Sequence, residues 1–109
     1  GYLAHYWARM DHVWGARADG RTVIKRKPST YLEKFYFDTI TFDPGMLRNM
    51  IERFGADHVM LGTDYPFNFH EPSPVGRLLE AGLDSSSKDA LSFNNALRFL
   101  GPRAGLQLT

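Results

Sequence analysis

Two aspartates stand where a parallel sheet would collect its reactive groups. Asp38 lies late in the aromatic and β-branched run Phe35–Ile40, and Asp64 follows the apolar run His58–Gly62 by two residues. Reactive side chains of parallel α/β sheets and barrels gather at the carboxyl ends of the strands. An aspartate placed there can bind a divalent metal through oxygen or transfer a proton. Spacing alone leaves two alternatives open: Asp64 can cap a loop, and Asp38 can bond to its neighbouring backbone.

Among the histidines, His70 is the candidate substrate contact. It follows Asp64 by six residues, on a loop that we expect at the mouth of the same sheet. The alternative is a solvent-facing loop residue. His5 and His12 lack the four-residue spacing of a helical zinc pair. His58 precedes a strand, where a surface turn is expected.

An amphipathic helix is predicted at the start of the chain. Its apolar residues recur at intervals of three and four and form one stripe: Leu3, Tyr6, Trp7, Met10, Val13 and Trp14. Gly15 is expected to end this helix. The polar segment 16–27 is irregular, and Pro28 then starts a short helical turn that extends to Lys34.

A strand–helix–strand unit is predicted next. The strand Phe35–Ile40 leads into a helix that Asp43 caps and Pro44 opens, and the strand His58–Gly62 follows. Short connections in this order predict two parallel strands joined by a right-handed crossover. The remaining predicted elements are a helix around 75–81, a helix over 84–100 and a tail at 102–109. The apolar stripe predicted for the helix over 84–100 consists of Ala90, Phe93, Leu97 and Leu100, with Leu91 beside it.

The composition excludes several classes of function. Thirteen Lys and Arg against twelve Asp and Glu give the 109 residues a net charge of +1, which argues against a nucleic-acid binder. Cysteine is absent, so disulfides and thiolate metal sites are excluded. No run approaches the roughly 20 apolar residues of a membrane span. Without a signal peptide, the expected location is cytoplasmic, and a chain that begins with Gly1 is expected to start inside a longer protein.

Four motifs stand in order along the chain. They are Phe35-Tyr36-Phe37-Asp38-Thr39, Asp43-Pro44 at a helix start, Val59-Met60-Leu61-Gly62-Thr63-Asp64-Tyr65-Pro66-Phe67, and Asn95-Ala96-Leu97-Arg98-Phe99-Leu100-Gly101. Through them nearly the whole chain resembles the C-terminal third of the amidohydrolase-related family, in the branch that includes aminocarboxymuconate-semialdehyde decarboxylase. The segment from Leu61 to Pro66 is the most specific part. The resemblance implies an α/β fold that is the last two to three βα units of a (β/α)8 TIM-like barrel, incomplete in this chain.

The resemblance also implies roles for two residues. In the family the last barrel strand ends in a metal-binding aspartate that can move a proton, and Asp64 matches it as both metal ligand and catalytic residue. The implied cofactor is a divalent metal, zinc above all, which would also help to hold a carboxylate substrate. Arg9 matches an arginine that binds the substrate carboxylate, in some members across a dimer interface, as its planar fork allows. Alternatively, Arg9 belongs to the solvated face of its helix.

Much of what such a site needs is missing. The family's His-x-His pair and its later histidine ligands have no counterpart here, and a catalytic metal site uses about three protein ligands. A closed barrel takes eight strands. We therefore expect the chain to be inactive alone, and to be completed by the missing barrel segment or in a homodimer.

Three hypotheses about function follow. The first is metal-dependent decarboxylation of a carboxylated aromatic or muconate-type substrate. A hydrolase of the same superfamily would use Asp64 as well. The third is a non-enzymatic βαβ module that associates through its aromatic residues, although such a module has no reason to keep a carboxylate on the turn Gly62–Pro66. A nucleotide-binding domain is disfavoured, because no Gly-rich phosphate loop is present.

Overall fold

The computed structural model describes residues 2–101 and divides the chain after Phe35 into two compact units. The predicted tail at 102–109 lies outside the described residues. Among the described residues, no helix combines the length and the apolar character that a membrane crossing requires.

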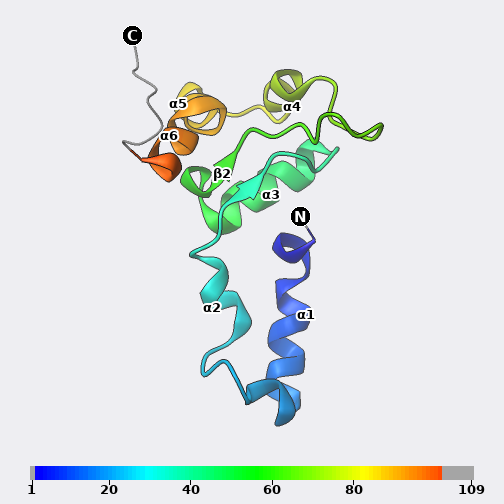
Figure 1. The fold of residues 1–109 in the computed structure, drawn as a ribbon, viewed down its shortest axis with the longest axis vertical. Coiled ribbons are helices and arrows are strands. Elements are labelled where there is room, and N and C mark those ends of the chain that lie inside the picture. Colours follow the sequence, from blue (N-terminus) through cyan, green and yellow to red (C-terminus); the bar gives the residue numbers. More distant parts are fainter. Residues whose placement is uncertain (1, 102–109) are drawn as a thin grey trace. The chain divides into compact units, whose positions relative to one another are not determined.

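The N-terminal unit is a helical hairpin. Its elements are α1 (Leu3–Ala16), the 3-10 turn η1 (Asp19–Arg21) and α2 (Pro28–Leu32), and α1 and α2 lie side by side (Figure 1). Asp11 joins them, because its Oδ1 accepts from the Ser29 N–H at 2.9 Å and its Oδ2 from the Ser29 hydroxyl at 2.6 Å. Gly15 does not end α1 as predicted, since the helix continues to Ala16. Among the described residues of α1, Ala4 alone is buried. In the predicted apolar stripe, Tyr6 and Val13 are exposed and the other four residues are half-buried.

The C-terminal unit begins with the predicted strand–helix–strand arrangement. Its elements are β1 (Phe37–Asp38), α3 (Pro44–Phe54), the 3-10 turn η2 (Ala56–His58) and β2 (Val59–Met60). The strands are parallel, with Phe37 opposite Val59 and Asp38 opposite Met60, which confirms the predicted pairing. Both strands are shorter than predicted. Beyond them, the Thr39 side chain joins the two segments, because its Oγ1 accepts from the Gly62 N–H, while Asp38 Oδ1 accepts from the Ile40 N–H within its own segment.

Helix α3 forms as its end signals predict. The Asp43 carboxylate accepts a hydrogen bond from the Met46 N–H at 2.8 Å, and Pro44 follows at the first helical position, where no N–H is needed. Gly55 ends the helix with a φ of 89°, a conformation that favours glycine. The buried residues of α3 are Leu47, Met50 and Phe54. The ring of Phe54 lies 4.6 Å from that of Phe37 on β1, so α3 packs against the strand pair.

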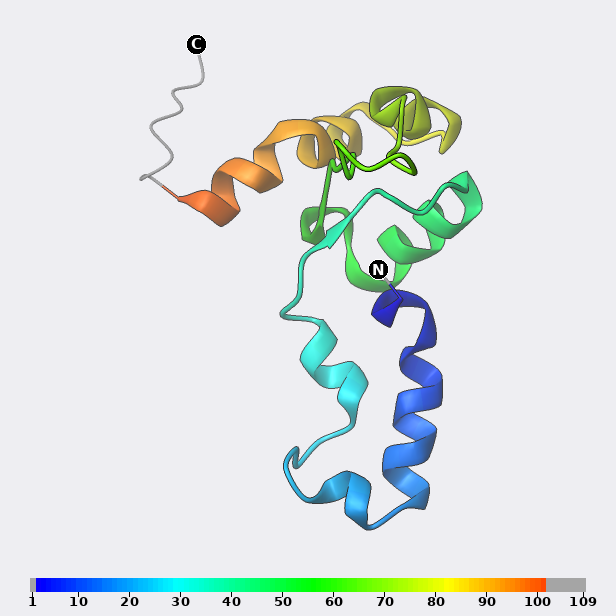
Figure 2. The same cartoon turned by 45° about the vertical axis from the view of Figure 1, so that its right-hand side comes forward.

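The predicted helix over 84–100 forms with one change of pitch. It runs without a gap through α5 (Ser85–Asp89), the π-helical turn η3 (Ala90–Asn94) and α6 (Asn95–Leu100) (Figure 2). The Asn95 N–H bonds to Ala90 O, five residues back, while Leu91 O accepts from the Leu61 N–H at 2.9 Å. The wide turn changes which face is buried. Leu91 and Asn95 are fully buried, whereas the predicted stripe residues Phe93 and Leu100 are 39% and 56% exposed.

The core of the C-terminal unit joins all of its parts. Helix α4 (Pro74–Glu80) supplies Leu78 to this core, and the strand pair and the other helices supply Leu47, Met50, Val59 and Leu91. Each of these five side chains is at most 1% exposed. Burial on this scale stabilises the unit, at about 1.5–3 kcal/mol for each large aliphatic side chain. The ends of the two strands are therefore fixed by a packed core.

Candidate metal and substrate site

The carboxyl ends of the two strands are held close together. Thr39, which follows β1, is fully buried and accepts the Gly62 N–H at 3.2 Å. Gly62 permits this approach, because a Cβ at its position would lie 3.0 Å from the Cβ of Asp38 and 3.3 Å from Ile40 Cδ1. The segments that carry Asp38 and Asp64 thus leave the sheet at the same edge.

Asp64 is presented outward by a sharp turn of the backbone. Its φ is 60°, in the left-handed region that asparagine and aspartate adopt more readily than other non-glycine residues. The Tyr65 N–H donates to Thr63 Oγ1 at 3.1 Å, and the Phe67 N–H donates to Asp64 O at 2.9 Å. The Asp64 carboxylate is exposed and has no hydrogen bond or ion pair within residues 2–101. It is therefore open to an external ligand.

His70 lies on the same loop as Asp64. This loop, residues 64–70, projects from the body of the C-terminal unit (Figure 1). His70 Nδ1 lies 2.7 Å from Phe67 O, and a carbonyl can only accept, so Nδ1 carries the proton in this contact. Nε2 of the same ring makes no hydrogen bond with the residues that the structure describes. The ring is half-buried, edge-on to that of Tyr65 at 6.0 Å.

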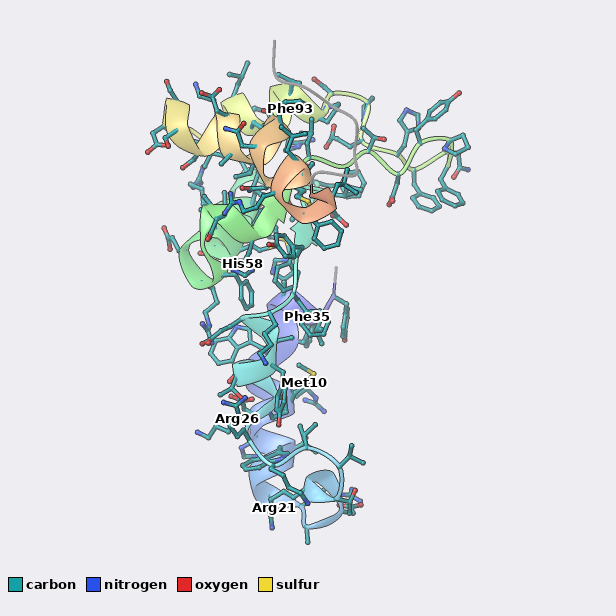
Figure 3. The ribbon with its side chains drawn as sticks, turned by 60° about the vertical axis from the view of Figure 1, so that its left-hand side comes forward. Met10, Arg21, Arg26, Phe35, His58 and Phe93 are labelled. Carbon is teal, nitrogen blue, oxygen red and sulfur yellow. The ribbon has the colours of Figure 1, made fainter. Side chains whose placement is uncertain are left out.

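Asp38 has the structural role that the sequence left open. Its Oδ1 accepts from the Ile40 N–H at 2.9 Å, a turn that leads the chain away from β1. His58 is also engaged, since its ring stacks on that of Tyr36 at 5.1 Å. It is the last residue of η2, directly before β2, and is labelled in Figure 3. Neither residue was among the site residues predicted from the family resemblance.

Arg9 stands on α1, in the other unit. Its side chain is exposed and makes no hydrogen bond or ion pair with any described residue. It lines an apolar cavity of about 310 Å³ within the N-terminal unit. The cavity is also lined by Met10 (Figure 3), Val13, Trp14, Gly20, Ile24 and Pro28. The structure therefore brings Asp64 and His70 into one loop, whereas Arg9 belongs to a separate unit.

Sequence reasoning missed a buried ion pair next to the Asp64 loop. Glu71 is 2% exposed, and its Oε2 lies 3.0 Å from Nε of Arg77 on α4. Burial raises the pKa of the Glu71 carboxyl, but the Ser73 N–H and the Arg77 guanidinium outweigh burial and hold this pKa below its usual range. The sequence shows that residue 71 carries a charge, but nothing in it predicted that this charge is buried. A partner six residues away matches no local helical spacing.

Asn95 is the second residue whose role the sequence did not reveal. It was noted as part of a motif, and the structure shows that it is fully buried. Its amide Nδ2 donates to Ala56 O and Val59 O, both at 2.7 Å, and its Oδ1 accepts from Arg98. Asn95 thus joins α6 to β2, the strand that leads to Asp64.

This chain can offer a catalytic metal one ligand, Asp64. Asp64 offers an exposed oxygen donor of the kind that divalent cations bind. Within residues 2–101, no group of three or more His, Cys, Asp or Glu side chains could enclose an ion. The other ligands of a complete site would have to come from outside these residues.

Comparison with known proteins identifies the family. A sequence model of the amidohydrolase family matches residues 3–101. The chain is 36% identical over 96 residues to the 2-amino-3-carboxymuconate-6-semialdehyde decarboxylase of Dictyostelium discoideum, covering 85% of this chain and 26% of that protein. It is 35% identical over 97 residues to the protein of the same name from Caenorhabditis elegans, covering 84% and 23%. The chain thus spans about a quarter of the length of these curated relatives.

Solved structures support the same assignment. The crystal structure of 5-carboxyvanillate decarboxylase LigW from Sphingomonas paucimobilis matches 88% of this chain and 30% of its own, with a TM-score of 0.73 and 28% identity. A dihydroxybenzoic acid decarboxylase from Polaromonas, with bound manganese and the inhibitor 2-nitroresorcinol, shares the fold over 96% of this chain and 32% of its own, with a TM-score of 0.75 and 21% identity. The mixed α/β arrangement therefore matches part of the fold of barrel decarboxylases. This chain belongs to the amidohydrolase family.

Proposed function

We propose that this chain forms the last βα units of a barrel decarboxylase, with Asp64 as a ligand of its catalytic metal. The observation that carries the proposal is the presentation of Asp64: an exposed carboxylate on a left-handed residue, without a partner among residues 2–101, at the carboxyl edge of a parallel strand pair. Active sites of barrels form at that edge. The decarboxylase names of the relatives favour this reaction over hydrolysis.

The substrate class is a carboxylated aromatic or muconate-type acid. In its decarboxylation, the bond between carbon and carboxylate breaks, carbon dioxide leaves, and the electron pair stays on the substrate carbon. That carbon must then take up a proton. Asp64 would hold this proton and deliver it, because its carboxylate is exposed and makes no hydrogen bond or ion pair with the residues that the structure describes. A divalent metal, zinc in our proposal, would supply positive charge to bind the substrate and stabilise charge that develops on it.

Arg9 and His70 would hold the substrate. The Arg9 guanidinium has no partner among the described residues and suits a bidentate contact with a substrate carboxylate. Arg9 would reach the active site of its own or a partner subunit in a homodimer. His70 would offer Nε2 to a substrate hydroxyl while Nδ1 stays on Phe67 O. Both roles predict a larger effect on KM than on the protonation step.

The test is Asp64→Asn in the full-length protein, with Asp89→Asn as the matched control on exposed helix α5. The amide keeps the size of the side chain but cannot transfer the proton and is a poorer metal ligand. We expect carbon dioxide release to fall by at least about 100-fold, as for the loss of a general acid. Metal content, measured by atomic spectroscopy, should fall as well. Turnover like that of the control would remove Asp64 from the mechanism.

The choice of substrates separates the two reactions. Carboxylated aromatics and muconate-type acids should release carbon dioxide, whereas amides and esters of similar size should remain intact. Hydrolysis of the amides or esters without carbon dioxide release would replace our proposal by the hydrolase hypothesis. The 109-residue chain alone should bind no stoichiometric metal, because its described residues supply too few donors. Tight stoichiometric zinc in that chain would show that the ligand set is complete without further barrel strands.

A further inference from the structure

Glu71 is a buried acid that the proposed reaction does not use. Its carboxylate is fixed on both oxygens: Oε1 accepts from the Ser73 N–H at 3.0 Å, and Oε2 pairs with Arg77 Nε at 3.0 Å. Arg77 is 21% exposed and also binds Oε2 of Glu80 at 2.7 Å. A buried carboxylate costs free energy unless it is paired, so its presence next to the Asp64 loop calls for a physical reason.

The backbone of Glu71 closes the base of the Asp64 loop. Its N–H donates to Thr63 O at 2.8 Å, and Thr63 is the residue immediately before Asp64. The loop between these two residues is otherwise bonded within itself, through Phe67 N–H to Asp64 O and His70 N–H to Phe67 O. Helix α4, Glu71, Thr63 and Asp64 therefore form one connected series.

This connection matters because the backbone of Asp64 is strained. A left-handed φ of 60° is unfavourable for an L-residue with a Cβ and persists where the surroundings impose it. The rest of the loop offers little support, since Tyr65, Phe67 and Phe69 are 77%, 58% and 61% exposed. Glu71 is the buried end of this loop, and α4 holds it.

We propose that Glu71 is a positioning residue for Asp64: its ion pair with Arg77 fixes the Thr63 end of the loop and thereby the direction of the Asp64 carboxylate. This inference rests on the proposed function of Asp64 as a metal ligand. Glu71 itself does not touch the metal or the substrate. It acts through one backbone hydrogen bond, so its loss should loosen the metal more than it weakens substrate binding, to which Arg9 contributes from outside this loop.

The test compares Glu71→Gln with Glu80→Gln in the full-length protein. Both acids bind Arg77, but Glu80 is 59% exposed and makes no hydrogen bond or ion pair with the described residues of the loop. Glutamine at 71 keeps an acceptor for the Ser73 N–H, but it removes the charge that Arg77 pairs with. We expect metal affinity or kcat to fall about 10- to 100-fold, as for other residues that orient metal ligands. KM should rise by a smaller factor than metal affinity falls, and Glu80→Gln should leave metal affinity and kcat within about twofold.

Thermal melting separates positioning from folding. If Glu71→Gln only lowers the melting temperature, while the folded variant keeps its metal affinity and kcat, the positioning role is overturned. If Glu71→Gln does not fold, Arg77→Lys tests the positioning role in its place. Lysine keeps the positive charge but cannot reproduce the contact of Arg77 Nε with Glu71 Oε2. Arg77→Lys should then show an intermediate loss of metal affinity, and wild-type affinity would overturn the proposal.

Asp64→Asn keeps the two proposals distinguishable. If Asp64→Asn leaves metal binding and turnover intact, the proposed function fails and the role of Glu71 fails with it. If Asp64→Asn abolishes turnover while Glu71→Gln and Arg77→Lys bind metal like the wild type, the positioning role alone fails. Losses in all three variants, with Glu80→Gln unaffected, support both.

Discussion

Replacing Asn95 by alanine should weaken the attachment of α6 to β2, the strand that leads to Asp64. The Asn95 side chain is fully buried, and its Nδ2 gives both of its hydrogens to backbone carbonyls, those of Ala56 and Val59, at 2.7 Å. Alanine removes both donors and leaves the carbonyls facing a methyl group. Asn94, the preceding residue, is exposed and makes no hydrogen bond through its side chain within residues 2–101. Asn94→Ala is therefore a matched control in the same helical segment.

The expected cost follows from the two carbonyls. Val59 is fully buried, so its carbonyl should lose close to the full desolvation penalty for an unmade hydrogen bond, about 1–3 kcal/mol. Ala56 is half-buried, and water can replace part of its lost bond. The hydrogen bond from Arg98 to Asn95 Oδ1 adds little, because Arg98 is exposed. Asn95→Ala should therefore lower the free energy of unfolding by about 2–4 kcal/mol in total.

Equilibrium urea denaturation of the full-length protein measures this change. The denaturation midpoints of wild type, Asn95→Ala and Asn94→Ala are comparable where the slopes agree. Asn94→Ala should lie within about 0.5 kcal/mol of the wild type, as exposed substitutions usually do. If Asn95→Ala also lies within that range, the two 2.7 Å contacts contribute nothing net, and our account of how α6 holds β2 is wrong.

Three further predictions concern the supports of the site. Gly62→Ala should lower the free energy of unfolding by about 1–3 kcal/mol, because the new methyl group would contact Asp38 Cβ, and it should also lower turnover. Gly15→Ala, in open space on α1, should not destabilise the protein. Equal melting temperatures of the two variants would contradict the close approach at Gly62. Asp43→Ala should cost about 1 kcal/mol through loss of the bond to the Met46 N–H, and an unchanged urea midpoint would show that this cap is dispensable. Because the folded-state pKa of Glu71 is lowered, its stabilisation is present above about pH 4.3 and is lost as the pH falls through that lowered value. The difference in stability between wild type and Glu71→Gln should thus shrink in acid, and a constant difference from pH 7 to pH 3 would refute the role of its charge.

The local signals in the sequence predicted the βαβ unit well. Asp43, Pro44 and Gly55 mark the ends of α3 through side-chain and backbone chemistry that acts within a few residues. The apolar run at β2 predicted a buried parallel strand, and the pairing of Phe37 with Val59 confirms it. Such signals are readable because cause and effect lie close together in the chain.

The contacts that hold the site could not be predicted in this way. Thr39 and Gly62 are 23 residues apart, and Asn95 and Val59 are 36 residues apart. No periodic pattern encodes a bond between a side chain and a distant backbone group. The π-helical turn is another example: a uniform 3.6-residue period predicted that Phe93 and Leu100 would be buried, but the wider turn moved Leu91 and Asn95 inward. Asp64 itself was predicted by its motif, which also marks where the strand ends.

The supports of Asp64 share one property that bears on its chemistry. Thr39, Asn95 and Glu71 all act on the strand or loop through backbone N–H and C=O groups, and the Asp64 carboxylate is left without a protein partner among residues 2–101. The carboxylates of Asp38, Asp43 and Asp84 differ, because in each of them one oxygen accepts a hydrogen bond from a backbone N–H. A carboxylate oxygen that already accepts from an N–H donor has fewer lone pairs for a cation. An acid that binds a metal and passes on a proton needs a backbone that is held in place and a carboxylate that has no other partner. Asp64 meets both conditions and Asp38 does not, so we assign Asp64 to the reaction.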